Sequence, residues 1–147
     1  MMIDETYTEI WTKILNCYYI SYIVNTQEKK FSQYSFFYFL LLIEKKFSLI
    51  QASKILNYLK KGGNKNINKH TNVAAYYLLT SEVLQNLNDF LKSRFKNKNV
   101  FYLKNNNVFI KFLFNLPKIP TIPIKDYKNL KSFKTFRMTA SEIDISY

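Results

Sequence analysis

Hydrophobic residues in the first segment recur three and four positions apart. Between residues 4 and 24 the stripe consists of Tyr7, Ile10, Trp11, Ile14, Leu15, Tyr18 and Tyr22. This spacing places side chains on one face of an α-helix, and the acidic residues near its start suit the positive end of a helix dipole. We predict a first helix whose aromatic residues, Trp11 and the tyrosines at 18, 19 and 22, pack in the core.

Two more helical patterns follow the break at NTQEKKFS. Ser32 is placed to cap a helix through QYSFFYFLLLIEKK, which is apolar nearly all round and is therefore expected to be central. Ser48 is placed to cap a third helix, LIQASKILNYLKK, with Gly62 as its stop. The same residues could equally continue the second helix. The next segment, GGNKNINKHTN, has the composition of an exposed polar loop.

The second half begins with a helical pattern and continues with two β-prone runs. Ser81 is placed to cap SEVLQNLNDFLKSRF, whose buried stripe is Val83, Leu84, Leu87, Phe90 and Leu91. After it, NVFYLK and VFIKFLF are separated by NNN, residues that tolerate a turn. We predict a β-hairpin here, covered on both faces because both faces of its second strand are mostly apolar.

The C-terminal segment repeats every third residue from Pro117 to Arg137. Prolines occupy one column, Lys125, Lys128, Lys131, Lys134 and Arg137 a second, and Ile124, Tyr127, Leu130, Phe133 and Phe136 a third. A polyproline II helix has three residues per turn and keeps each column on its own edge. A short helix over 125–136 with a solvated basic face, or a proline-rich ligand for a protein groove, are the alternatives.

Together these patterns predict an α+β chain with four regions. They are N-terminal helices over residues 1–61, a basic loop over 62–72, a helix with the β-hairpin over 73–116, and an extended basic arm over 117–147. A chain of 147 residues is the size of one domain.

Charge directs attention to an anionic partner. The formal net charge is +12, from 22 Lys and Arg against 10 Asp and Glu, and 18% of the residues are aromatic. A chain this basic attracts polyanions, and a chain this rich in aromatic residues is expected to be ordered. The abundance of Lys, Asn, Ile, Phe and Tyr follows AT-rich codons, which favours an organellar genome or an AT-rich microbe, and the acidic N-terminus is unlike a transit peptide. We therefore expect a protein of the mitochondrial matrix that is encoded in the organelle.

The residue counts exclude several kinds of site. Cys17 and His70 are each the only residue of their type, and Gly62 and Gly63 are the only glycines. These counts exclude an intrachain disulfide, a tetrahedral Cys/His zinc site and a glycine-rich phosphate loop. The apolar run FFYFLLLI is too short to span a membrane. We expect no enzyme activity, no cofactor or metal, no small-molecule substrate and no membrane span, with Cys17 a buried hydrophobe.

From Ser48 onward the order of elements resembles the small-subunit ribosomal proteins of the bacterial S-eight family. The resemblance rests on Ile55 and Asn57 in an I-x-N pattern, the basic loop, the segment SEVLQNLNDFL, and the strand-like VFYL and VFIKFLF. It covers about two thirds of the chain, and it implies binding to ribosomal RNA. The family's Ser-Lys-Pro-Gly turn is replaced by KNLKSFKTF, so no individual RNA contact is transferred.

The sequence thus predicts a structural protein of a ribosome, with the mitochondrial small subunit as the assembly and ribosomal RNA and neighbouring ribosomal proteins as partners. The alternative is a peripheral accessory subunit of a mitochondrial respiratory membrane complex. The residues expected to bind RNA lie in the basic loop and the arm: Lys60, Lys61, Lys65, Lys69, His70, Lys118, Lys125, Lys128, Lys131, Lys134 and Arg137.

Overall fold

The computed structural model describes residues 3–28, 32–60, 71–95, 100, 101, 103 and 106–117. Its regular elements within these ranges are five α-helices: α1 (Ile3–Glu28), α2 (Gln33–Lys60), α4 (Thr71–Gln85), α5 (Leu87–Phe95) and α6 (Asn106–Phe114). The described part contains no strand, so it is all-α and the predicted α+β class is wrong.

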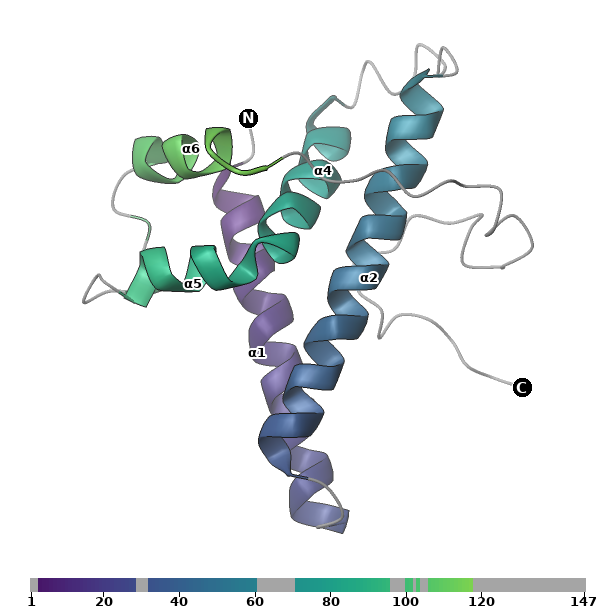
Figure 1. The fold of residues 1–147 in the computed structure, drawn as a ribbon, viewed down its shortest axis with the longest axis vertical. Coiled ribbons are helices and arrows are strands. Elements are labelled where there is room, and N and C mark those ends of the chain that lie inside the picture. Colours follow the sequence, from purple (N-terminus) through teal and green to yellow (C-terminus); the bar gives the residue numbers. More distant parts are fainter. Residues whose placement is uncertain are drawn as a thin grey trace.

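Helices α1 and α2 form a long antiparallel hairpin that sets the length of the molecule (Figure 1). Two cross-helix contacts fix their register. Lys13 Nζ lies 3.2 Å from Glu44 Oε2, and the rings of Tyr18 and Phe37 meet edge to face with centroids 6.0 Å apart. The first helix was predicted correctly, and Asp4 and Glu5 occupy its first turn, where a helix dipole favours negative charge.

Helix α4 packs against both arms of this hairpin, beside α2 and opposite to it in direction (Figure 1). At its end, Gln85 Nε2 donates a hydrogen bond to the Lys45 carbonyl at 2.8 Å. Asn86 then interrupts the helix: its carbonyl accepts from the backbone N–H groups of Asp89 and Phe90, both at 3.1 Å. Helix α5 begins at the next residue, Leu87, and leads the chain away from α2 (Figure 1).

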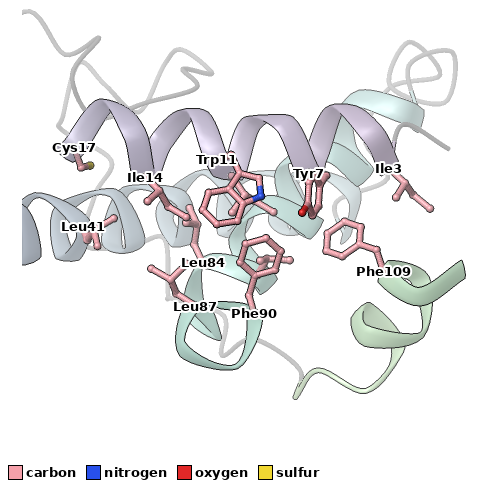
Figure 2. Packing of buried hydrophobic residues seen from close by; sticks show 12 residues of the cluster. Ile3, Tyr7, Trp11, Ile14, Cys17, Leu41, Leu84, Leu87, Phe90 and Phe109 are labelled. Atoms are coloured by element: carbon pink, nitrogen blue, oxygen red, sulfur yellow. The ribbon is translucent and has the colours of Figure 1, made fainter. Parts of the chain in front are cut away.

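Helices α5 and α6 close an aromatic core over the first half of α1 (Figure 2). The Tyr7 ring meets Phe109 at 5.3 Å and Phe90 at 5.8 Å between centroids, and Trp11 meets Phe90 at 5.6 Å. Tyr7 also donates a hydrogen bond to the Val100 carbonyl at 2.7 Å. Tilted and edge-to-face contacts of this kind stabilise beyond the area that they bury.

Two predicted helix starts are wrong. Residues 33–60 form one continuous helix, which was the alternative left open, and Ser48 lies inside it with its Oγ donating to the Lys45 carbonyl at 2.9 Å. Ser81 lies in the middle of α4, which begins at Thr71. Both hydroxyls are buried within helices. Ser48 bonds back to the preceding turn instead of capping, whereas Ser81 Oγ has no hydrogen-bond partner. The buried stripe of Val83, Leu84, Leu87 and Phe90 is confirmed, and Leu91 is half-buried.

The predicted β-hairpin is replaced by α6. An almost fully apolar run such as VFIKFLF fits a buried strand and a helix equally well by periodicity. Phe109, Phe112, Leu113 and Leu116 are three and four positions apart and pack on the core together. NNN is not a hairpin turn, because Asn106 and Asn107 begin the helix. Of the first predicted strand, Val100 and Phe101 lie in a turn and Leu103 has no regular structure.

The predicted burial of the hairpin residues is also partly wrong. Trp11 and Cys17 are buried as expected, but Leu15 and three tyrosines of the same helix, Tyr18, Tyr19 and Tyr22, are about half exposed. In the run FFYFLLLI of α2, Leu41 is buried, while Tyr38, Phe39, Leu42 and Ile43 are exposed. The reason is positional: α4 ends at the level of Lys45, so these residues lie beyond its reach.

Candidate functional site

The residues predicted to bind RNA fall almost entirely outside the described part of the chain. Lys60 is the last residue of α2. The other ten, in the loop and the arm, lie outside the described residues, as do residues 118–137 of the three-residue repeat: Lys61, Lys65, Lys69, His70, Lys118, Lys125, Lys128, Lys131, Lys134 and Arg137. The RNA site therefore stays a prediction from sequence.

The described residues nevertheless carry almost none of the surplus positive charge. They include eight basic and seven acidic residues, a formal charge of +1, whereas fourteen basic and three acidic residues, a formal charge of +11, lie outside them. Charge is thus divided between a nearly neutral helical body and strongly basic remaining segments. Any attraction to a polyanion must come mainly from those segments.

The main ionic cluster of the body is buried between helices. Lys13, only 2% exposed, lies on α1 with its Nζ 3.2 Å from Glu44 Oε2 on α2 and 3.4 Å from Glu9 Oε1 one turn earlier. The Glu9 contact has an ion-pair distance without a well-formed hydrogen bond. A buried ammonium group requires such anionic neighbours.

Two neutral side chains next to this cluster have strongly shifted protonation equilibria. Burial, and then the charge of Glu44, raise the pKa of the Cys17 thiol to about 12. Burial also raises the pKa of Tyr76 on α4, and the charge of Glu9 and a hydrogen bond to it act in the same direction. Thiol and phenol therefore stay protonated at neutral pH, which makes Cys17 a poor nucleophile.

Polar side chains continue along the contact between α2 and α4. Gln51 Nε2, Thr80 Oγ1 and Ser81 Oγ are buried without a hydrogen-bond partner. Near them, Lys54 Nζ donates to Gln51 Oε1 at 3.2 Å, and burial lowers the pKa of Lys54 to about 8. Burial likewise raises the pKa of Glu82. These groups can fix the pairing of the helices, but among the described residues they supply no accessible nucleophile with an adjacent base.

Neither a metal site nor a membrane-spanning helix is found among the described residues. No group of three or more His, Cys, Asp or Glu side chains in the described ranges could hold a metal ion. The described helices also include none that is both long and apolar enough to cross a membrane.

Sequence reasoning missed the ionic cluster, although a signal for it exists. Lys13 lies three positions after Ile10 and four before Cys17, so it occupies the buried face of α1. Glu44 lies three positions after the buried Leu41. A charge on a buried stripe demands a partner, but the identity of that partner depends on the register of two helices that the local pattern does not encode.

Comparisons with known proteins add no relative. No protein-family model, no curated protein and no solved structure matches the chain.

Proposed function

We propose that the chain is a structural, RNA-binding protein of a ribosome, with the mitochondrial small subunit as its assembly. The observation that carries this proposal is the division of charge: the described helices carry a formal +1 and the remaining segments +11. In such a protein the helices form a scaffold and the basic segments neutralise RNA phosphate. The AT-biased composition supports the organellar assignment.

The proposal is tested by the salt dependence of binding to small-subunit ribosomal RNA. The test variant changes Lys125, Lys128 and Lys131 to Gln. The matched control changes Lys46, Lys92 and Lys111, which are exposed on the helices, so both variants lose three positive charges. Each phosphate contact contributes about 0.7 to 0.9 to the slope of log K against log salt concentration.

We expect a wild-type slope of several units, a fall of about two units for the first variant, and little change for the control. A wild-type slope near zero would refute phosphate recognition. Equal effects of both triple variants would show that net charge, and not the basic column, sets the affinity. In gradient sedimentation of organelle lysate, the chain is expected to travel with ribosomal RNA.

One observation favours a second candidate, a peripheral accessory subunit of a respiratory membrane complex. The end of the α1–α2 hairpin exposes large apolar side chains, among them Tyr18, Tyr22, Tyr38 and Leu42. Such a surface fits packing against other subunits. Sedimentation with detergent-solubilised membrane complexes, in place of ribosomal RNA, would select this candidate.

A further inference from the structure

An uncharged apolar surface covers the end of the α1–α2 hairpin. We define the outer hairpin face by its six exposed residues: Leu15, Tyr18 and Tyr22 on α1, and Tyr34, Tyr38 and Leu42 on α2. Their exposed fractions run from 41% for Leu42 to 75% for Tyr34. Figure 1 shows this end of the hairpin extending beyond α4 and α5.

Helix geometry places the six residues on one side of the hairpin. Tyr18 and Tyr22 each follow a buried residue, Cys17 and Ser21, and Leu42 follows the buried Leu41. Successive residues are about 100° apart around a helix axis. A residue that follows a buried seam residue therefore points about 100° away from the seam. Because α1 and α2 are antiparallel, this step brings such residues of both helices to the same side of the pair. The hairpin thus has a buried seam between its helices and an exposed apolar face next to that seam.

The same face is covered at the other end of α1. Tyr7 and Trp11 lie eleven positions before Tyr18 and Tyr22 respectively, on one helical stripe, and they contact Phe90 of α5. The stripe is therefore continuous, and only its second half lacks a cover. A helix with two adjacent apolar faces is typical of a bundle, where it has two neighbours.

The chemistry of the face indicates what can cover it. The sequence has no Asp, Glu, Lys, Arg or His between Lys13 and Glu28, or between Lys30 and Glu44. Without cations the face cannot neutralise phosphate, which argues against an RNA backbone as its occupant. An occupant must instead be apolar, with uncharged polar groups that can meet the tyrosine hydroxyls.

We propose that the occupant is the outer hairpin face of a second copy of this chain, which gives a four-helix bundle of two hairpins. Four tyrosines and two leucines, each about half exposed, offer on the order of 600 Å², since a large side chain buries about 150 to 250 Å². A stable interface takes about 800 Å² from each partner. About 600 Å² from each copy reaches the low end of the standard range, about 1,200 Å² in total, and the exposed Tyr19, Phe39 and Ile43, a further 100° round each helix, lie at the edges of this face.

Electrostatics permits this pairing. A two-fold interface brings the same patch together with itself, so a charged patch would repel its own copy. The outer hairpin face carries no charge, and the helical body around it has a formal charge of only +1. The +11 of the other segments opposes association over longer distances, where salt screens it. This pairing does not depend on RNA binding.

The test is the mass of the purified full chain in sedimentation equilibrium, from about 1 to 100 µM in 0.5 M KCl without RNA, where the Debye length is short. We expect twice the chain mass of 17.6 kDa. The test variant combines Tyr22→Gln and Tyr38→Gln. The control combines Phe95→Gln and Phe114→Gln, which removes two aromatic rings that are even more exposed, 67% and 84%, on α5 and α6.

The tyrosine variant is expected to raise the dimer dissociation constant at least tenfold, and the phenylalanine control to leave it unchanged. Should the tyrosine variant not fold, as judged by circular dichroism, the single substitution Tyr38→Gln takes its place, with Phe114→Gln as the matched control. A single-chain mass at 100 µM overturns the proposal. So does equal weakening by both pairs, or a monomer that binds neutral phosphatidylcholine vesicles. RNA binding in low salt is scored separately, so either proposal can fail alone.

Discussion

At the scale of single residues, the most consequential feature is a lysine in the interior. Lys13 is held by Glu44 across the hairpin and by Glu9 on its own helix. Desolvating such a cluster costs several kcal/mol per ion, and its mutual attraction repays that cost only while the cluster is intact. The cluster therefore specifies which turn of α1 faces which turn of α2 more than it stabilises the fold.

Replacing one partner of this cluster should lower the free energy of unfolding more than replacing both Lys13 and Glu44. Lys13→Met leaves Glu44 without its ammonium partner inside the protein, and we expect a loss of about 3 to 5 kcal/mol of unfolding free energy. The double variant Lys13→Met/Glu44→Leu should lose clearly less than the sum of the two single variants. Urea denaturation of the four proteins in the cycle measures this coupling, and additive losses would show that the pair is not coupled.

Cys17 should be almost inert in the native protein. Its side chain is 3% exposed and its pKa is raised to about 12, against an ordinary value of 9.0. The thiolate is the reactive form, so maleimide labelling at pH 8 should be about a thousandfold slower in the folded chain than in urea. Mass spectrometry of timed samples measures both rates. Labelling of the folded chain at the urea rate would contradict the burial.

Lys54 should make stability depend on alkaline pH. Burial lowers its pKa from 10.5 to about 8. Below pH 8 the ammonium group is charged in both states, but it is desolvated only in the folded state. As pH rises from 8 to 10.5, the folded chain releases this proton first and the cost disappears. The opposing effect of Cys17, whose raised pKa favours the unfolded state above pH 9, is common to wild type and variant.

Lys54→Met isolates this effect. At pH 7 the variant should exceed the wild type by about 1 to 3 kcal/mol of unfolding free energy, and its advantage should vanish towards pH 10.5. Lys46→Met, at an exposed position of the same helix, should show no pH-dependent difference. A constant difference between Lys54→Met and wild type at all pH values would mean that Lys54 stays charged.

At the scale of elements, local patterns predicted the helices that have a clear period and failed where the pattern is uniform. The stripe from Tyr7 to Ile14 and that from Val83 to Phe90 lie as predicted. The run VFIKFLF has apolar residues at nearly every position, so its period could not separate helix from strand. Tyr18 and Tyr22 have the same spacing as Tyr7 and Trp11, yet they are exposed, because burial depends on where α4 and α5 end. The ionic cluster follows from helix register, which no local pattern contains.

Proline substitution distinguishes helix from strand in α6. Lys111→Pro removes a backbone donor inside the helix and clashes with the preceding turn, so we expect a loss of about 3 kcal/mol. Asn106→Pro, at the first position of the helix, should cost less than about 1 kcal/mol because that donor has no helical partner. Lys111→Ala controls for the lost charge. Similar losses for both proline variants, measured by urea denaturation, would argue against the helix.

At the scale of the whole molecule, charge and apolar surface occupy different parts of the chain. The described helices are nearly neutral and expose apolar residues at one end of the hairpin, while the remaining segments hold +11. Two kinds of contact can then be made at once, one apolar through the hairpin and one ionic through the basic segments. Because only the ionic contact is screened by salt, ionic strength separates the two.

Salt should therefore act in opposite directions on the free and the RNA-bound chain. For the free chain, a net charge of +12 means self-repulsion, which shrinks as the Debye length falls from about 30 Å at 0.01 M to about 3 Å at 1 M salt. Its melting temperature should rise over this range. For the complex, the RNA-induced increase in melting temperature follows RT ln(1 + [L]/Kd) and should vanish as Kd rises with salt. Differential scanning fluorimetry with and without small-subunit ribosomal RNA measures both trends. An RNA-induced increase that persists at 1 M KCl would mean that the contact is not with phosphate, because a predominantly ionic contact cannot survive that screening.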